Sequence, residues 1–289
     1  MTGRLFIFGL GFCGLEIAKL ARDAGWTVAG TVRTADKAAR LRARGLEAHV
    51  FDGTGPLPAT ALERASHVLC TIAPGEPGGD PVLSTCARRL QEARWLGYLS
   101  TTGVYGNSDG TWVDESTPPR PAQPRSVRRL AAERGWQALG LEIGAAVDIF
   151  RLPGIYGPGR SAIDQVKAGT ARRIDKPGQV FSRIHVEDVA GAVLKAVGRR
   201  AAGAIYNVAD DLPASTADVV AFACALLGQP APPLIPWDEA AATMSPMARS
   251  FYAENRRVRN DRVKTELGLA LRYPTYREGL RAIHALSEG

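Results

Sequence analysis

The chain has 289 residues and a formal net charge of +7, with 45% hydrophobic and 22% charged residues. This composition is that of a globular α/β protein able to bury a substantial core, as one large domain or two lobes. The basic residues are scattered over predicted helices, and no zinc-finger spacing or RNA-binding signature occurs, so we expect no nucleic-acid partner. Anionic small ligands explain the positive charge equally well.

Two further classes are excluded by local patterns. Residues 219–237 are uncharged but contain four prolines, which predicts a helix and a proline-rich loop rather than a membrane span. The cysteines form no C-x-x-C pair, and the histidines form no ligand cluster, so we expect no metal site. Unpaired thiols are typical of the reducing cytosol, and the expected location is cytoplasmic. The four cysteines are Cys13, Cys70, Cys86 and Cys224.

The chain begins with a predicted strand at residues 4–8, a G-x-G-x-x-G motif at residues 9–14 and an amphipathic helix. Gly9 permits the tight turn, Gly11 lets a pyrophosphate approach the backbone, and Gly14 lets helix and strand pack closely. Phe12 and Cys13 lie in the same turn, whose free N–H groups would face the pyrophosphate. This arrangement predicts a dinucleotide site rather than an ordinary glycine-rich turn.

The end of the next predicted strand, residues 27–31, indicates which dinucleotide binds. An acid there would bond the adenosine 2′-hydroxyl of NAD, but the residue is Arg33, and no carboxylate occurs from residue 26 to 35. Arginine suits the extra 2′-phosphate of NADP, so we predict NADP, with NAD the less favoured alternative. A solvated loop arginine is the competing interpretation of Arg33, and Asp36 is the nearest acid for a ribose.

Strands and helices alternate through the first half of the chain. Further strands are predicted at residues 48–51, 67–72, 96–100 and 146–151, and helices at residues 58–64, 80–94 and 127–141. This βαβ order predicts a Rossmann-type α/β fold, a doubly wound parallel sheet that binds ligands at the carboxyl ends of its strands.

The alternation changes after residue 151. Strands are predicted at residues 183–186 and 205–208, helices at residues 187–197 and 216–227, and helical pieces within residues 244–287. We therefore predict a dinucleotide-binding domain over residues 1–157, to which strands near residues 183–208 return. A smaller substrate-binding lobe follows over residues 158–289.

Four later segments carry a more specific pattern. They are S-T-T-G-V-Y-G at residues 100–106, R-L-P-G-I-Y-G-P-G at 151–159, I-H-V-E-D-V-A at 184–190 and Y-N-V at 206–208. Together with the glycine loop, they resemble the extended short-chain dehydrogenase/reductase family, which includes NAD(P)-dependent nucleotide-sugar epimerases and dehydratases. The resemblance spans most of the chain and implies an oxidoreductase that acts on a small molecule.

The resemblance implies roles for individual residues. Asp52 would bond the adenine amino group, with Gly53 under the ring, and Thr71, Ile72 and Ala73 would line the nicotinamide ribose. Thr101 aligns with the catalytic hydroxyl that holds the substrate oxygen, where a donor would stabilise a carbonyl as hydride arrives. The alternative is that Thr101 is a strand-end threonine that bonds its own loop.

The chain departs from the family at the proton relay. The family places Y-x-x-x-K on the helix after this loop, four residues before a glutamate. If Glu133 is that glutamate, the tyrosine and lysine positions are Arg125 and Arg129. Arg129 can still bond a ribose, but an arginine stays charged and cannot exchange protons near neutral pH. The glycine motif also departs from the usual G-x-x-G-x-x-G, so both features indicate an atypical branch.

Two functions follow from these observations. One is an NADP-dependent oxidoreductase or epimerase/dehydratase-like enzyme acting on an anionic molecule, with a nucleotide-sugar the first candidate and a carboxylated metabolite the second. The other is a catalytically silent NADP(H)-binding sensor or regulatory protein. Tyr156, His185, Asp114 and Glu115, with Tyr105, are the candidate replacement proton donors. The predicted substrate residues are Tyr105, Arg160, Arg172 and Arg183.

The resemblance also implies a homodimer. In the family, the helices expected here at residues 80–94 and 127–141 pair across a two-fold axis as a four-helix bundle. The substrate, the direction of reaction and the occurrence of hydride transfer are left open by the sequence.

Overall fold

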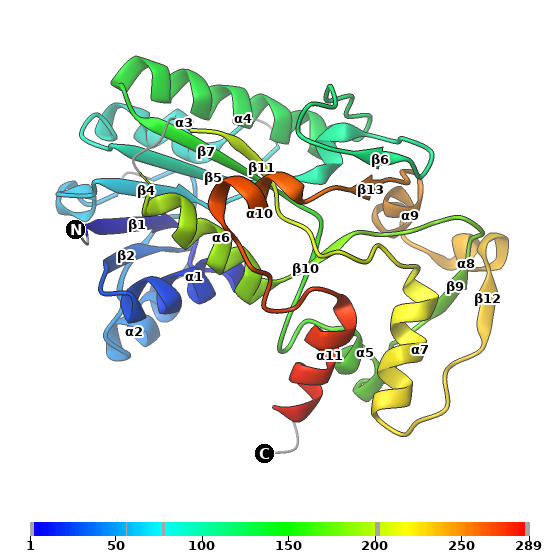
Figure 1. Ribbon diagram of the computed structural model, residues 1–289. Helices are drawn as coiled ribbons and strands as arrows, with labels where there is room; N and C mark the ends of the chain where they lie inside the picture. Colours follow the sequence, from blue (N-terminus) through cyan, green and yellow to red (C-terminus); the bar gives the residue numbers. More distant parts are fainter. Residues whose placement is uncertain (1–2, 56, 77–78, 200–202, 287–289) are drawn as a thin grey trace.

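The computed structural model describes residues 3–55, 57–76, 79–199 and 203–286. Its centre is a parallel sheet of seven strands in the order β11-β7-β5-β4-β1-β2-β3 (Figure 1). The order reverses direction between β1 and β4, which places a ligand crevice at the carboxyl ends of these strands. The predicted Rossmann-type sheet is confirmed. The strands are β1 (Arg4–Phe8), β2 (Thr27–Val32), β3 (Glu47–Val50), β4 (His67–Cys70), β5 (Trp95–Thr101), β7 (Ala146–Leu152) and β11 (Ile205–Asn207).

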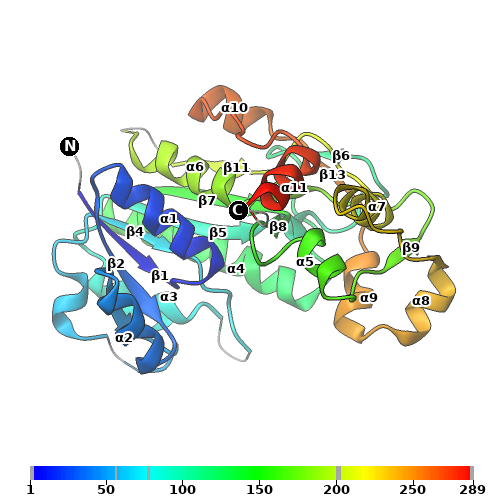
Figure 2. The same cartoon turned by 90° about the horizontal axis from the view of Figure 1, so that it is seen from below.

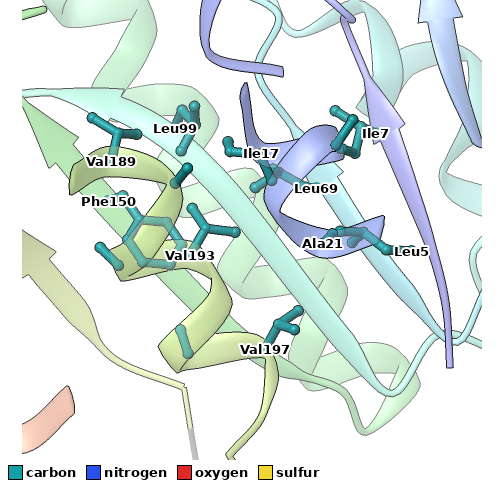
Figure 3. Packing of buried hydrophobic residues seen from close by; sticks show 14 of the residues in the cluster. Leu5, Ile7, Ile17, Ala21, Leu69, Leu99, Phe150, Val189, Val193 and Val197 are labelled. Carbon is teal, nitrogen blue, oxygen red and sulfur yellow. The ribbon is translucent and has the colours of Figure 1, made fainter. Parts of the chain in front are cut away.

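Helices cover both faces of this sheet because the apolar side chains of β1 alternate. Leu5 and Ile7 belong to a core shared with α1 (Phe12–Asp23) and α6 (Val186–Val197). Figure 3 shows these two helices side by side, with Ile17 and Val193 among the buried residues between them and the strands. On the other face, Phe6 and its neighbours pack against α3 (Pro81–Cys86) and α4 (Pro124–Ile143).

The predicted helix over residues 80–94 is wrong in length. The structure ends α3 at Cys86 and continues with the 3₁₀ turn η2 (Ala87–Arg89), after which Leu90 and Ala93 follow in tight turns. The Arg89 guanidinium donates to the carbonyls of Leu57 and Pro58, which holds the turn away from a helical path. Leu90 and Ala93 still reach the core, so the apolar periodicity persists without a continuous helix.

Smaller elements complete this part of the chain. They are α2 (Ala35–Ala43), α10 (Asp261–Leu267), η1 (Ala59–Leu62) and η3 (Thr102–Tyr105). Across the described ranges, none of the helices is long and apolar enough to cross a membrane.

A second group of elements gathers to one side of the sheet (Figures 1 and 2). Its helices are α5 (Ala162–Lys167), α7 (Thr216–Leu226), α8 (Trp237–Thr243), α9 (Pro246–Tyr252) and α11 (Tyr276–Ala285). Three pairs of short parallel strands accompany them: β8 (Gly154–Tyr156) with β10 (Arg183–His185), β9 (Arg173–Asp175) with β12 (Leu234–Pro236), and β6 (Trp112–Val113) with β13 (Arg257–Val258). β11 joins the central sheet, whereas β10 pairs with β8 outside it. The domain division at residue 157 stays a prediction.

Candidate functional site

The three glycines of the first loop meet three different steric demands. Gly9 has a φ of +96°, and a Cβ there would lie 2.5 Å from the Thr71 hydroxyl oxygen. A Cβ on Gly14 would lie 2.1 Å from the Gly9 carbonyl oxygen, so the helix can approach the strand only without a side chain. At Gly11, by contrast, a Cβ would meet no described atom beyond its chain neighbours within 4 Å. That open space is what a pyrophosphate needs next to the backbone.

Neighbouring strand ends hold the loop in place. The Gly9 N–H donates to the Thr31 hydroxyl at 2.9 Å, and the Leu10 N–H donates to the Thr31 carbonyl at 2.7 Å. The Thr71 hydroxyl donates to the Gly9 carbonyl at 2.7 Å. Because β2 and β4 both bond the loop, its shape is fixed before any ligand arrives, which lowers the entropic cost of binding.

The first turn of α1 presents free backbone donors. The Leu15 N–H donates to the Gly11 carbonyl at 2.9 Å, so the N–H groups of Phe12, Cys13 and Gly14 precede the first helical bond of this kind. Such groups, at the positive end of the helix dipole, favour an anion. Burial raises the pKa of the Cys13 thiol to about 11, so the side chain is a neutral loop residue rather than a thiolate.

A cavity of about 840 Å³ opens beside this loop, at the carboxyl ends of β1, β2 and β4. Its volume is within the usual range for cofactor pockets. Phe12, Cys13, Gly14 and Arg129 lie outside its lining. The predicted cofactor residues that line it are Gly9, Gly11, Arg33, Asp52, Gly53, Thr71, Ile72 and Ala73.

One rim of the cavity is basic. Arg33 follows β2, is exposed and makes no hydrogen bond or ion pair within the described parts of the chain. Lys37 lies on the same rim. Its backbone N–H donates to the Thr34 hydroxyl at the start of α2. Asp36 is ion-paired with Arg40 along α2 and is absent from the cavity lining. Two cations and a helix N-terminus therefore meet at the place where an adenosine 2′-substituent is expected.

Asp52 is held in a tight turn after β3. Its Oδ1 accepts hydrogen bonds from the Thr54 N–H and hydroxyl, both at 2.9 Å, and from the Gly55 N–H at 3.2 Å. These bonds hold the pKa of the Asp52 carboxyl below its usual range, so the group is ionised at neutral pH. Its bond to an adenine stays a prediction, as does the role of Gly53, whose φ of +98° shapes the same turn.

The Thr101 hydroxyl bonds its own loop. Its Oγ1 accepts a hydrogen bond from the Gly103 N–H at 3.1 Å and so caps η3. This is the alternative that the sequence left open for Thr101, although the hydroxyl hydrogen remains able to donate. Thr101 lies outside the lining of the 840 Å³ cavity, and its catalytic role stays a prediction.

Arg125 and Arg129, the two arginines predicted to occupy the relay positions, both contact protein groups. Arg125 donates to the Ser250 hydroxyl at 2.6 Å, and its guanidinium lies 4.4 Å from the centre of the Phe251 ring. Arg129 donates to the Leu99 carbonyl and, at 3.3 Å, to the Tyr98 hydroxyl. Arg125 thus joins α4 to α9, and Arg129 joins α4 to β5. Ribose binding by Arg129 stays a prediction.

A buried polar network lies beneath these positions. Glu133 and Arg151 form an ion pair at 2.8 Å, with both side chains nearly inaccessible, and the Ser100 hydroxyl donates to Glu133 at 2.5 Å. The Arg151 guanidinium lies 4.9 Å from the centre of the Tyr105 ring. The Tyr105 hydroxyl donates to Asn207 at 2.8 Å. Burial raises the pKa of Tyr105, which is only 3% exposed. Tyr105 lines neither the 840 Å³ cavity nor the smaller cavity described next, so its substrate role stays a prediction.

A second cavity, of about 560 Å³, lies between the β8–β10 pair and helices α5, α7 and α11. Arg160 and Arg183 both line it, whereas Arg172 is directed to the Thr243 hydroxyl of α8, 3.2 Å away. The Arg160 guanidinium lies 5.5 Å from the centre of the Phe12 ring, so the exposed side of this cavity adjoins the glycine loop. The structure therefore brings two of the three predicted substrate arginines together.

The sequence did not identify the far wall of this cavity. Tyr276 and Leu280 of α11 lie against it, more than a hundred residues from Gly154 in the chain. No local pattern relates these positions. The tyrosine of the R-x-x-x-x-Y-G-P segment, Tyr156, does line the cavity, and that motif was the available signal. No three His, Cys, Asp or Glu side chains come together as a metal site among the residues that the structure describes.

Comparison with known proteins identifies the family. The profile of the NAD dependent epimerase/dehydratase family matches residues 78–209. Protein YeeZ of Escherichia coli K12 is 30% identical over 217 residues, which cover 71% of this chain and 77% of YeeZ. The chain belongs to the NAD-dependent epimerase/dehydratase family. The resemblance seen in the sequence motifs is confirmed.

Two solved structures share the fold of this chain. A functionally unknown conserved protein from Silicibacter pomeroyi is 46% identical, with all of both chains covered and a TM-score of 0.89. The UDP-glucose 4-epimerase of Thermus thermophilus, solved in complex with NAD, is 21% identical over 99% of each chain, with a TM-score of 0.76. The second likeness concerns the fold alone and agrees with the Rossmann-type sheet described above.

Proposed function

We propose that this family member is an NADP(H)-dependent oxidoreductase, epimerase/dehydratase-like, acting on an anionic small molecule in the cytoplasm. The observation that carries the proposal is the 840 Å³ cavity, which joins the open glycine loop at Gly11 to the basic rim at Arg33 and Lys37. In a dinucleotide bound to a Rossmann-type fold, the pyrophosphate lies at the glycine loop and the adenosine ribose lies at the end of the second strand. The solved relative from Thermus thermophilus, which binds NAD, supports the dinucleotide assignment.

The preference for NADP(H) rests on Arg33 and Lys37. Both line the cavity, and the nearby carboxylate Asp36 is paired with Arg40 rather than with the cavity. A charge-assisted bond to the 2′-phosphate contributes on the order of 1.5–3 kcal/mol, which corresponds to a preference of about tenfold or more. Because Arg33 is exposed, solvent screening places its interaction with the 2′-phosphate at the lower end of this range.

A missing proton relay constrains the reaction. Arg125 stands at the tyrosine position, is permanently charged and bonds Ser250. The proton that accompanies hydride transfer would therefore have to come from, or go to, another group. Of the alternatives, Tyr156 lines the second cavity, whereas the Glu115 carboxylate accepts the Asn207 N–H at 2.7 Å. Burial lowers the pKa of His185 to about 4, so this imidazole is neutral at pH 7.

The substrate is proposed to be anionic because Arg160 and Arg183 share one cavity. A nucleotide-sugar and a carboxylated metabolite are the two candidate classes. We also propose a homodimer formed through α4, whose Val127 and Leu141 side chains are 48% and 86% exposed. The short α3 offers less surface to such a bundle than the predicted helix would have offered.

Calorimetric titration with NADPH and NADH tests the cofactor. NADPH should bind at least about tenfold more tightly, and Arg33→Ala should remove most of that difference. Arg44→Ala is the matched control, since this exposed arginine lies at the end of the adjoining helix α2 and outside the cavity lining. Equal affinities for both cofactors, or an Arg33→Ala variant with unchanged NADPH affinity, would contradict the proposal.

The second candidate function is a catalytically silent NADP(H)-binding sensor. The hydrogen bond from Arg125 to Ser250 favours it, because this guanidinium is held by α9 and stays charged, so it cannot transfer a proton. Stopped-flow absorbance of NADPH during exposure to candidate substrates separates the two functions. A reductase oxidises NADPH in the presence of substrate, and product analysis of the same mixture detects an epimerase or dehydratase, which converts substrate without net oxidation of the cofactor. A sensor leaves both cofactor and substrate unchanged.

A further inference from the structure

The second cavity has apolar walls and a charged floor. Val219, Val220, Tyr276 and Leu280 form the side contributed by α7 and α11, which pack against α5 (Figure 2). On the opposite side lies the β8–β10 pair, in which Arg183 is the register partner of Gly154. A cavity of about 560 Å³ with these walls has the size and lining of a small-molecule site.

Arg183 is anchored by one nitrogen and open at the others. Its Nη1 donates to the carbonyl oxygens of Phe181 at 2.7 Å and Ala214 at 2.8 Å. Nε and Nη2 have no hydrogen-bond partner among the described residues, the guanidinium carbon lies 6.0 Å from the centre of the Phe181 ring, and the side chain lines the cavity. The two remaining donors form the planar fork that bonds both oxygens of a carboxylate.

Arg183 is not hydrogen-bonded to a carboxylate. Within the described residues its acceptors are two backbone carbonyl oxygens, and burial lowers its pKa. The acid with the largest electrostatic effect on Arg183 is Asp210, which is 1% exposed. Burial raises the pKa of Asp210 to about 8, so most of this carboxyl is uncharged at pH 7. An unpaired charge in such surroundings is costly, and an anionic ligand would offset that cost.

The remaining charges favour a single negative group over a diphosphate. Asp164 also lines the cavity, with its Oδ2 accepting a hydrogen bond from the Ser161 hydroxyl at 2.6 Å, and it would repel a second negative charge. Arg160 is exposed at the side near Phe12, where it already contacts an aromatic ring. The other lining side chains are uncharged: apolar ones on α7 and α11, and the polar Gln165, Thr170 and Thr216.

We propose that this cavity binds a small apolar monocarboxylate, such as an aromatic acid, with its carboxylate on Arg183 and its body between Tyr156, Tyr276 and Leu280. The inference rests on the proposed function, because it narrows the anionic substrate to one class. It places a nucleotide-sugar outside the set of ligands. The aromatic walls contribute through area removed from water, at about 25 cal/mol per Å².

Calorimetry on the full chain with NADPH present tests the class. Phenylacetate is the probe, phenylacetamide its neutral isostere and UDP-glucose the diphosphate alternative. We expect phenylacetate to bind at least about tenfold more tightly than the amide and than UDP-glucose. Equal binding of acid and amide, tighter binding of UDP-glucose or no binding of phenylacetate would each overturn the proposal.

Two variants locate the site. Arg183→Gln removes the fork but also the bonds to Phe181 and Ala214, so its folding is at risk. Gly154→Leu avoids this problem, because a Cβ there makes only ordinary contacts, 3.6 Å from the Ser182 carbonyl and 3.8 Å from Arg183 Cγ. The leucine would occupy the space beside Arg183. Both variants should lose at least about tenfold in phenylacetate affinity.

Arg281→Gln is the control, since this exposed arginine of α11 pairs with Glu278 and lies outside the cavity lining. It should bind phenylacetate as the original chain does. Phenylacetate affinity unchanged in Gly154→Leu would refute the location. NADPH titration of the same samples separates the two proposals. If the original chain does not bind NADPH, the proposed function is contradicted. The preference for phenylacetate over phenylacetamide is also measured without NADPH, so that it tests the carboxylate site by itself.

Discussion

Arg125 donates a hydrogen bond to the Ser250 hydroxyl at 2.6 Å, across 125 residues of chain. Its guanidinium also lies over the Phe251 ring. Arg125, which the sequence analysis placed at the position of the family's proton-transferring tyrosine, thus fastens α9 to α4.

We expect Arg125→Ala to lower the free energy of unfolding by about 1–2 kcal/mol, the sum of one partly exposed hydrogen bond and one cation–π contact. NADPH affinity should remain unchanged, because Arg125 lies outside the cofactor cavity. Urea denaturation and calorimetry measure the two quantities. Arg134→Ala, an exposed position on the same helix, is the control and should change neither. A large loss of NADPH affinity in Arg125→Ala would show that this arginine contacts the cofactor.

The buried pair of Glu133 and Arg151 provides a second prediction. Glu133→Ala leaves the Arg151 guanidinium unpaired in the core and should cost about 3–5 kcal/mol. Replacing both residues by apolar ones, as Glu133→Leu with Arg151→Met, should restore much of that loss. Urea denaturation of the single and double variants measures the coupling, with the exposed Glu142→Ala on α4 as control. Additive losses would mean that the ion pair carries no coupling energy.

An added methyl group should affect stability at one glycine of the loop and NADPH binding at another. Gly14→Ala should destabilise the apoprotein, because its Cβ would collide with the Gly9 carbonyl. Gly11→Ala should leave the melting temperature of the apoprotein nearly unchanged, since its Cβ enters open space and its φ of −91° suits alanine. It should nevertheless weaken NADPH binding by at least about tenfold, because the methyl group occupies the pyrophosphate space. Thermal melts and calorimetry separate the two effects, and unchanged NADPH affinity in Gly11→Ala would place the pyrophosphate elsewhere.

The pKa of Asp210 predicts a loss of stability as the pH rises. Burial raises the pKa of this carboxyl to about 8 in the folded protein, so between its unfolded pKa near 4 and pH 8 the folded state binds the extra proton. Its contribution to stability is therefore greatest at low pH and falls by up to about 1.4 kcal/mol per pH unit toward pH 8.

Titration of His185 changes the stability in the opposite sense between pH 4 and 6.5, where stability rises with pH. Its folded pKa of about 4 lies below the unfolded value of 6.5, so its contribution is lost as the pH falls from 6.5 to 4. The Asp210 effect is therefore best isolated between pH 6.5 and 8. Urea denaturation across this window should show a smaller decline with pH in Asp210→Asn than in the original chain. Parallel pH profiles would mean that Asp210 is ionised in the folded state.

Local patterns in the sequence determined the first part of the molecule. The strand over residues 4–8 and the helix after the glycine loop were predictable because neighbouring residues alone set their period and their turn. The roles of Gly9 and Gly14 in the loop were also predictable, because any turn of this shape leaves no room for a Cβ at these positions. The parallel sheet followed from the alternation of elements.

Contacts between distant segments decided the rest. The helix expected over residues 80–94 ends early because Arg89 bonds carbonyls more than thirty residues away. Likewise, only the folded chain brings Arg183 opposite Tyr276 of α11, while Arg172 turns to Thr243 of α8. Arg160, Arg172 and Arg183 look alike in the sequence, because the residue type specifies a positive charge but not where the side chain points. Direction is set by which distant backbone and side chains each guanidinium meets, and this depends on tertiary packing.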